Sequence, residues 1–216
     1  MEIKNKRIVL TGAAGGMGKL LAGELAKHGA NLAIVDSNEE ALGVVATNLP
    51  GSHPIAGDLS TAKGCQTVAD QCLEKLGGID MLINLAGINS FAAYEDESPE
   101  KMEAMLHVNL LAPMWLTRAF LPLMLENNSG RIVNVGSVFG SIGFAYFSIY
   151  SASKFGLRGF SEALRREVAD TNVKVTYIAP RAVKTPMNSD ALMRMGEATN
   201  MNMDAPEDVV QKIILA

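Results

Sequence analysis

Two hydrophobic periodicities alternate along the whole chain, and this alternation constrains the fold more than any other feature of the sequence. Short, continuously apolar runs, typical of strands covered on both faces, are separated by longer amphipathic segments. The runs are RIVLTG (7–12), NLAIVD (31–36), SHPIAGD (52–58), DMLINLAG (80–87), GRIVNVGS (130–137) and VKVTYIAP (173–180). The predicted helices are 17–28, 39–48, 62–76, 99–127, 150–169 and 206–215. This β-α-β-α order predicts an α/β fold, a doubly wound parallel sheet of six strands in one domain, 1–216.

The composition indicates a packed globular domain. Apolar residues make up 48% of the 216 positions, enough to bury a sizeable core. The net charge is −4 and no long basic stripe stands out, so nucleic acid is not an expected partner. Cys65 and Cys72 are too few and too far apart for a disulfide framework or a metal knuckle, and we expect packed thiols. His28, His53 and His107 are not clustered, so no metal is expected.

The apolar segments give no prediction of a membrane anchor or a signal peptide. The stretch HVNLLAPMWLTRAFLPLML (107–125) is interrupted by Arg118 and two prolines, which argues against a membrane span. The N-terminal apolar run soon breaks into glycines, and Lys19 follows. We therefore expect a cytoplasmic protein with no membrane partner.

The first predicted strand ends in a glycine-rich turn, TGAAGGMG, and a helix follows directly. Such a turn lets backbone N–H groups approach a pyrophosphate at a helix N-terminus, although a tight turn without a ligand is the alternative. The spacing is neither G-x-G-x-x-G nor Walker A. It resembles the nucleotide loop of the short-chain dehydrogenase/reductase family, which implies a Rossmann-like domain. The residues that would contact the cofactor are Gly12, Gly15, Gly16, Met17 and Gly18.

Asp36 ends the second predicted strand, eighteen residues after Gly18. A carboxylate here can accept hydrogen bonds from both ribose hydroxyls of an adenosine and would repel a 2′-phosphate. The following Ser37 and Asn38 supply no cation. We therefore predict NAD as the cofactor over NADP. The alternative is that Asp36 caps the next helix.

The resemblance implies further cofactor contacts after the later strands. Asp58 and Leu59 match the family's adenine-binding position. The turn NLAG (84–87) matches an Asn-Asn-Ala-Gly motif, with Leu85 in place of the second Asn. The segment APRAVKTPM resembles the Pro-Gly-x-Val-x-Thr segment that grips the nicotinamide, except that Arg181 stands where Gly is usual. The matching residues are Asp58, Leu59, Asn84, Ala86, Gly87, Pro180, Val183 and Thr185.

Tyr150 and Lys154 are four residues apart in a predicted helix and therefore share a face. A nearby ammonium favours the phenolate, so we expect the pKa of Tyr150 to be lowered and the phenol to act as a general acid and base. A surface Tyr–Lys pair is the alternative. Ser137 lies thirteen residues before Tyr150, and the set resembles the Ser-Tyr-Lys centre of short-chain dehydrogenases, in which both Tyr150 and Lys154 also contact the cofactor.

Asn109 lies four residues before Pro113, inside a long predicted helix. Proline cannot donate to the carbonyl at i−4, so we expect a kink that frees the Asn109 carbonyl. The resemblance implies that Asn109 holds a water leading to Lys154. The predicted catalytic residues are Asn109, Ser137, Tyr150 and Lys154.

Together these features predict an NAD(H)-dependent oxidoreductase that interconverts a secondary alcohol and a ketone. One alternative is an NADPH-dependent 3-oxoacyl reductase of fatty-acid type. The other is a catalytically silent protein that senses NAD(H). We expect the residues that determine substrate specificity to lie in 138–147 and in 186–205. The second segment is irregular and methionine-rich, and it is a candidate lid. The phenylalanines and methionines of these segments suggest an apolar small-molecule substrate.

The family resemblance also bears on assembly. Family members usually continue into one more strand, whereas this sequence stops at Ala216, so we expect that strand to be missing. Because that strand often contributes to a tetramer interface, we favour a homodimer through the two long helices, with a tetramer as the alternative.

Overall fold

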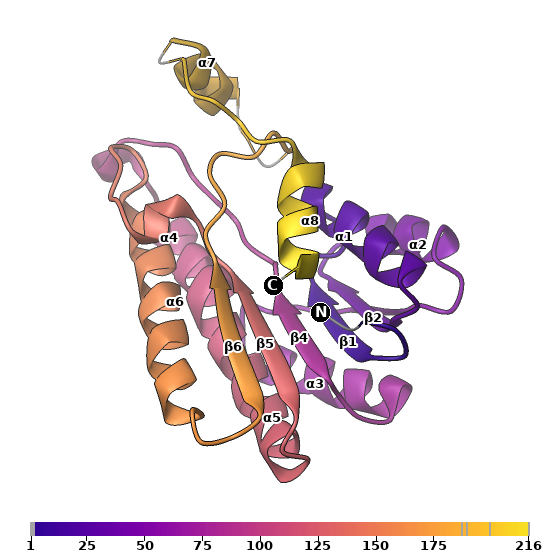
Figure 1. Cartoon of the computed structure of the whole chain (residues 1–216). Helices are drawn as coiled ribbons and strands as arrows, with labels where there is room; N and C mark the ends of the chain where they lie inside the picture. Colours follow the sequence, from indigo (N-terminus) through magenta and orange to yellow (C-terminus); the bar gives the residue numbers. More distant parts are fainter. Residues whose placement is uncertain (1–2, 187, 189, 199, 216) are drawn as a thin grey trace.

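The computed structural model describes residues 3–186, 188, 190–198 and 200–215, and it is built around a parallel six-stranded sheet. The strand order is β3-β2-β1-β4-β5-β6, which confirms the predicted doubly wound fold (Figure 1). The strands are β1 (Arg7–Thr11), β2 (Asn31–Asp36), β3 (His53–Ala56), β4 (Met81–Asn84), β5 (Gly130–Val135) and β6 (Val173–Ile178). Each one lies within a predicted apolar run.

Helices cover both faces of the sheet (Figure 1). One buried cluster joins the sheet to α3, α5 and α6, and the other joins it to α1, α2 and α8. This double coverage is why the strands are continuously apolar. The helices are α1 (Gly16–Lys27), α2 (Glu39–Thr47), α3 (Ala62–Leu76), α4 (Pro99–Leu106), α5 (Ala112–Glu126), α6 (Ser148–Glu167), α7 (Asp190–Ala198) and α8 (Pro206–Leu215). Two 3-10 turns are η1 (Tyr94–Asp96) and η3 (Val138–Gly140).

Side-chain caps fix the start of several helices. Asn38 accepts from Ala41 N at 3.0 Å at the start of α2, and Thr61 caps α3 in the same way. Ser98 caps α4, where Pro99 takes a first-turn position that needs no N–H donor. By contrast, α1 begins after Gly15 with no side-chain cap. Its first N–H groups therefore do not receive the side-chain acceptor that a Ser, Thr, Asn or Asp cap would provide.

The long helix predicted at 99–127 is divided by a π-helical segment, η2 (His107–Leu111). The N–H of Ala112 donates to His107 O, one residue further back than in an α-helix. Pro113 follows at the start of α5, so the expected kink takes the form of a π-bulge next to a proline.

The helical run Pro99–Glu126 is the one candidate membrane span among the described residues, by length and composition. In the fold it packs against α3 and the sheet, and Leu116, Phe120 and Met124 have no exposed surface. Its apolar character is accounted for partly by this packing, although only 39% of its most apolar window is buried.

The stretch 186–205 was expected to be irregular, but residues 190–198 form α7, which stands away from the sheet beyond the carboxyl ends of the strands (Figure 1). Met187 lies outside the described residues. Cys65 and Cys72 are free and fully buried, as expected of packed thiols, and burial raises the pKa of each to about 12.

Candidate active site

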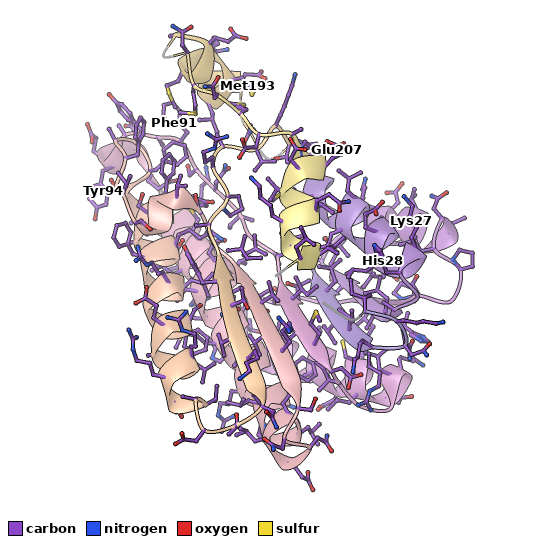
Figure 2. The ribbon with its side chains drawn as sticks, in the orientation of Figure 1. Lys27, His28, Phe91, Tyr94, Met193 and Glu207 are labelled. Carbon is purple, nitrogen blue, oxygen red and sulfur yellow. The ribbon has the colours of Figure 1, made fainter. Side chains whose placement is uncertain are left out.

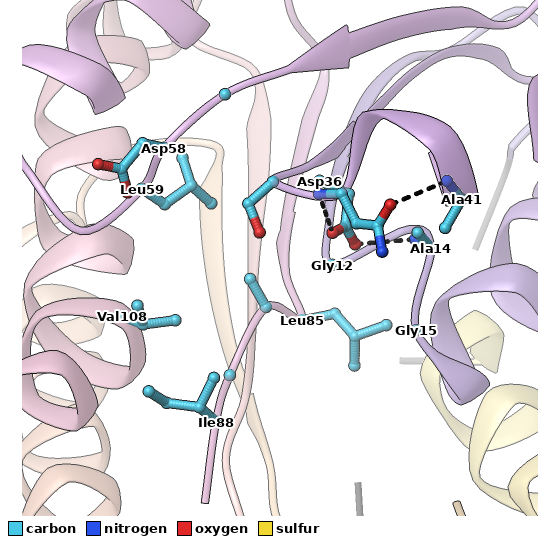
Figure 3. A pocket seen from close by; sticks show the side chains of 15 residues that line it. Gly12, Ala14, Gly15, Asp36, Ala41, Asp58, Leu59, Leu85, Ile88 and Val108 are labelled. Carbon is cyan, nitrogen blue, oxygen red and sulfur yellow. Dashed lines mark hydrogen bonds between the residues drawn. The ribbon is translucent and has the colours of Figure 1, made fainter. Parts of the chain in front are cut away.

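A pocket of about 370 Å³ opens at the carboxyl ends of β1, β2, β3 and β4 (Figure 3). This is the edge at which parallel α/β sheets bind ligands. Seven predicted cofactor residues line it: Gly12, Gly15, Asp36, Asp58, Leu59, Ala86 and Gly87. The pocket therefore brings together residues from four strand ends that are far apart in the sequence.

The glycine-rich turn needs its glycines for close backbone packing. Gly12 has φ +70°, and a Cβ there would lie 2.8 Å from the backbone of Ala86. A Cβ on Gly18 would lie 2.0 Å from the carbonyl oxygen of Gly12. Gly16 is packed against Thr185 and Pro186, while Met17 packs against the core beneath α1. Gly16, Met17 and Gly18 thus support the turn without lining the pocket.

Asp36 lies at the pocket edge and joins two of its walls. One carboxylate oxygen accepts from Ala14 N at 2.9 Å, and the other accepts from Asn38 N at 3.1 Å (Figure 3). The cap of α2 is Asn38, so the alternative role of Asp36 as a helix cap is not realised. The carboxylate retains lone pairs toward the pocket that ribose hydroxyls could fill.

Asp58 and Leu59 line the opposite wall of the pocket. Ser60 donates its backbone N–H to Asp58 Oδ1 at 2.8 Å, and hydrogen bonds from Ser60 lower the pKa of this carboxyl. Asp58 is therefore ionised at neutral pH and can accept a hydrogen bond.

Asn84 does not line the pocket, in contrast to Ala86 and Gly87 of the same turn. Its side chain is 2% exposed and donates to Asn134 Oδ1 on the neighbouring strand at 2.8 Å. The turn is held instead by Thr11, whose hydroxyl accepts from Leu85 N and Ala86 N, both at 3.1 Å. Thr11 opens the glycine-rich motif and ends β1, and it was not among the predicted cofactor contacts.

Tyr150 and Lys154 share one face of α6, as predicted. Lys154 Nζ lies 5.7 Å from the centroid of the Tyr150 ring and donates to Val135 O at 3.2 Å. Ser137, the second residue after β5, lies near enough to Tyr150 for its hydroxyl to lower the pKa of that phenol. A Cβ on Gly87 would lie 3.6 Å from Lys154 Nζ, so this lysine stands behind the pocket wall. Ser137, Tyr150 and Lys154 therefore converge beside the pocket.

The expected lowering of the Tyr150 pKa is not found. Burial raises the pKa of Tyr150, and the hydrogen bond from Ser137 opposes that rise only in part. Burial also lowers the pKa of Lys154 to about 8, because this residue is only 4% exposed. Burial disfavours the charged form of both groups, so it raises the pKa of the phenol and lowers that of the lysine.

Asn109 connects the π segment to the turn after β4. Its side chain accepts from Ile88 N and donates to Ile88 O, both at 2.8 Å, and also donates to Ser153 at 3.1 Å. Ser153 in turn donates to Tyr150 O at 2.7 Å. Asn109 has no exposed surface, so its side chain ties α6 to the pocket wall.

The segment after β6 reaches the glycine-rich turn but does not line the pocket. Pro180 O accepts from Val138 N at 2.9 Å, and Val183 O accepts from the side chain of Asn188 at 2.8 Å. Thr185 lies against Gly16. Pro180 and Thr185 are thus placed beside the Ser137 turn and the glycine-rich turn, respectively.

Arg181, which replaces the family's usual glycine, is paired with Asp204. Arg181 Nε donates to Asp204 Oδ2 at 3.2 Å, and a guanidinium Nη2 contacts the other oxygen. The backbones are also joined, because Asp204 N donates to Ala182 O at 2.7 Å and Lys184 N donates to Asp204 O at 3.2 Å. This clasp, residues 181–184 with Asp204, closes the base of the excursion that carries α7.

Aromatic rings surround Tyr150. Phe139 and Phe147 are edge-on to it, at 6.4 and 5.9 Å between centroids. Phe139 also stacks on Phe144, and Phe147 packs against Phe91. Phe91, Tyr94 and Met193 lie at one end of the molecule (Figure 2). The stretch 138–147 thus gives the surroundings of Tyr150 an apolar, aromatic character.

Several pocket residues were not predicted. They are Ala14, Ser37, Asn38, Ala41, Gly57, Leu85, Ile88 and Val108. Most adjoin a motif residue, so widening each motif by one position would have found them. Val108 lies in η2, next to Asn109.

Known proteins share this arrangement. A family model described as short chain dehydrogenase matches residues 6–195. The 3-oxoacyl-[acyl-carrier-protein] reductase of Bos taurus is 38% identical over 187 residues, 86% of this chain and 79% of that protein. Among solved structures, 3-ketoacyl-(acyl-carrier-protein) reductase from Brucella melitensis complexed with NADH is similar, with a TM-score of 0.89 and 27% sequence identity. The match covers 97% of this chain and 89% of that one. A metagenomic short-chain oxidoreductase in complex with NADP has a TM-score of 0.84 and 29% sequence identity, and the match covers 100% of this chain and 92% of that one.

Proposed function

We propose that this chain, which belongs to the short-chain dehydrogenase/reductase family, interconverts a secondary alcohol and a ketone with NAD(H). Family membership makes it an NAD(P)-dependent oxidoreductase. The observation that carries the finer proposal is the convergence of Ser137, Tyr150 and Lys154 beside the pocket that Asp36 borders.

The residues of the pocket fit a dinucleotide. Gly12 and Gly15 leave backbone rather than side chains at the start of α1, and Asp36 and Asp58 offer carboxylate acceptors on opposite walls. When bound, the nicotinamide would accept or donate the hydride. The adenosine half of the dinucleotide would be held by Gly12, Gly15, Asp36, Asp58 and Ala86.

The chain's own residues handle the proton and the substrate oxygen. In reduction, Tyr150 donates its phenol proton to the oxygen that was the ketone carbonyl, and Ser137 donates a hydrogen bond that orients this oxygen. In oxidation, the Tyr150 phenolate removes the alcohol proton. Lys154 stands beside the phenol, and we propose that protons pass from it to water near Asn109.

Asp36 supports NAD(H) over NADP(H). Its carboxylate stands at the pocket edge beside Ser37 and Asn38, and none of these side chains carries a cation for a 2′-phosphate. The solved relatives bind NADH in one case and NADP in the other, so the preference of this chain rests on Asp36.

The first experiment is a titration of the purified protein with NADH and NADPH, followed by nicotinamide fluorescence. We expect NADH to bind more tightly, and Asp36→Ala to reduce the difference. A screen of alcohols and ketones with the preferred cofactor follows. Tyr150→Phe should reduce turnover by about 100-fold or more while NADH still binds. Unchanged turnover in Tyr150→Phe would exclude the mechanism.

The second candidate is a 3-oxoacyl reductase, which is favoured by the 38% identity to the bovine 3-oxoacyl-[acyl-carrier-protein] reductase. The same Ser137, Tyr150 and Lys154 would serve that reaction. Preference for NADPH in the titration, together with turnover of a 3-oxoacyl thioester, would select this candidate over the first.

The rings around Tyr150 support an apolar substrate. Phe139 and Phe144 would contact the substrate, and the buried ring of Phe147 packs behind Phe139 and Tyr150. We also propose that the protein works in the cytoplasm as a homodimer formed through α4–α5 and α6.

A further inference from the structure

Tyr177, near the end of β6, reaches from its strand to the two elements that carry the proposed catalytic residues. It lies on the same face of β6 as Val173 and Val175, which pack into the cluster shared with α5 and α6. Its neighbour in the sheet is Asn134 on β5, three residues before Ser137. The phenol therefore ends beside the turn that follows β5.

Three hydrogen bonds place the Tyr177 hydroxyl between two backbones. Ser137 N donates to Tyr177 Oη at 3.3 Å. The phenol hydrogen is directed at Ser137 O, 3.2 Å away, with Lys154 O a second acceptor at 3.5 Å. One hydroxyl thus binds the peptide groups on both sides of Ser137 and the carbonyl of Lys154 in α6.

Two glycines make room for this phenol. A Cβ on Gly136 would lie 2.2 Å from Tyr177 Oη, and its three nearest atoms would all belong to Tyr177. A Cβ on Gly140 would also lie 2.2 Å from Tyr177 Oη and 2.7 Å from Lys154 O. The turn after β5 therefore approaches α6 closely because both residues lack side chains.

We propose that Tyr177 is a positioning residue for the reaction, fixing the Ser137 backbone against α6 so that the Ser137 hydroxyl stays beside Tyr150. The inference rests on the proposed function, in which Ser137 and Tyr150 act together. Tyr177 is not among the residues that line the cofactor pocket, so it acts through Ser137.

The charge of Tyr177 does not enter into this role. Burial raises its pKa above the ordinary value for a phenol, so the group is neutral at assay pH. Replacing it with phenylalanine removes the hydrogen bonds and leaves the net charge and ring volume unchanged. Ionised Tyr177 also raises the pKa of Tyr150, so loss of the Tyr177 hydroxyl would by itself lower that pKa. An upward shift of the Tyr150 pKa in Tyr177→Phe therefore reports the position of Ser137.

The test compares Tyr177→Phe with Thr176→Val, which removes a hydroxyl from the adjacent residue on the opposite face of β6. We expect Tyr177→Phe to lower kcat by about 10- to 100-fold, because small misplacements of a catalytic group are costly. NADH affinity should stay within about twofold by fluorescence titration, and Thr176→Val should match the wild type.

A pH titration separates positioning from a loss of folded protein. The Ser137 hydrogen bond lowers the pKa of Tyr150, so weakening it should move that pKa upward in Tyr177→Phe. The shift is measured in the pH profile of kcat and by ultraviolet titration of the phenolate, with Tyr150→Phe as the blank. If Tyr177→Phe does not fold, Gly136→Ala should give the same shift, because it displaces the same ring.

The double variant Ser137→Ala/Tyr177→Phe tests the route. If Tyr177 acts through Ser137, the second change adds nothing to Ser137→Ala. Additive losses in kcat, or an unmoved Tyr150 pKa, would overturn the proposal even where Tyr150→Phe abolishes turnover. Absence of turnover in the wild type with both cofactors would instead overturn the proposed function, and the phenolate titration would still decide whether Tyr177 holds Ser137 to Tyr150.

Discussion

At the scale of single residues, burial opposes charge on both members of the Tyr150–Lys154 pair. It raises the pKa of the phenol and lowers that of the ammonium to about 8. The protein without its cofactor therefore holds Tyr150 as a neutral phenol at neutral pH. That form is the proton donor that ketone reduction requires, and it is not the base that oxidation requires.

We expect the two directions to differ in their pH dependence. Because the raised pKa keeps Tyr150 protonated, ketone reduction should be flat through neutral pH and decline only in alkaline solution. Alcohol oxidation should rise with pH over the same range, because it needs the phenolate. Measuring kcat in both directions from pH 6 to 10 tests this: reduction should stay level over the range, while oxidation should still be rising at pH 10. An oxidation rate that is already maximal at pH 6 would contradict it.

Lys154→Met should make the folded protein more stable at pH 7 while abolishing turnover. The folded-state pKa of Lys154, about 8, is depressed below its unfolded value, so the charged form is disfavoured by folding. The buried ammonium destabilises the folded state fully below pH 8, and this destabilisation decreases as the pH rises toward the unfolded-state pKa of the lysine. We expect a gain of about 1–3 kcal/mol in unfolding free energy by urea denaturation.

The sign of the pH dependence provides the control. The advantage of Lys154→Met over the wild type should shrink between pH 8 and pH 10. A lysine that contributes to stability through its bond to Val135 would give the opposite result, a loss at pH 7.

The spacing of Tyr150 and Lys154 was sufficient to predict that they share a helix face, because i, i+4 periodicity is local. The expectation that Ser137 lies beside them came from the family resemblance. The spacing was not sufficient to predict the direction of the Tyr150 pKa shift, because Tyr150 is buried by residues outside the motif, such as Phe139 and Phe147. Asn84 shows the same limit: its partner Asn134 lies fifty residues away on β5. Tyr177 was missed because its role depends on sheet register alone.

At the scale of elements, the six strands and most helices were predictable from the sequence, because the periodicity of apolar residues and the capping residues are local features. The break at η2 was predicted as a kink, but its π-helical form depends on the packing of Asn109 against Ile88. Helix α7 was missed, since its sequence is short, methionine-rich and placed far from the core. Its position depends on the clasp of residues 181–184 with Asp204.

The clasp gives a prediction at this scale. Arg181→Gln should loosen the base of the excursion at 185–203, so we expect faster cleavage there by a dilute protease and a raised KM for the ketone. Lys27→Gln, which breaks the exposed Lys27–Glu24 pair on α1, is the matched control. Equal cleavage of the two variants would mean that the backbone bonds of Asp204 suffice without Arg181.

At the scale of the whole molecule, the sheet is covered on both faces, yet large apolar side chains remain on the outer surface. Phe155 on α6 is 44% exposed and Leu125 on α5 is 40% exposed. Helix α6 packs against α4 and η2, so these helices form one continuous layer. Covering that layer with a second copy would account for the apolar residues of Pro99–Glu126 that the fold leaves unburied.

Phe155→Glu should therefore convert the proposed homodimer to a monomer, because a carboxylate would be buried without a partner at the interface. Light scattering coupled to size exclusion measures the mass directly. Val44→Glu, at a site 59% exposed on α2, is the control and should leave the dimer intact. A monomeric wild type would show that the proposed interface does not exist. A tetramer that survives Phe155→Glu would show that the subunits associate through another surface. NADH binding should be retained in both variants, since neither residue lines the cofactor pocket.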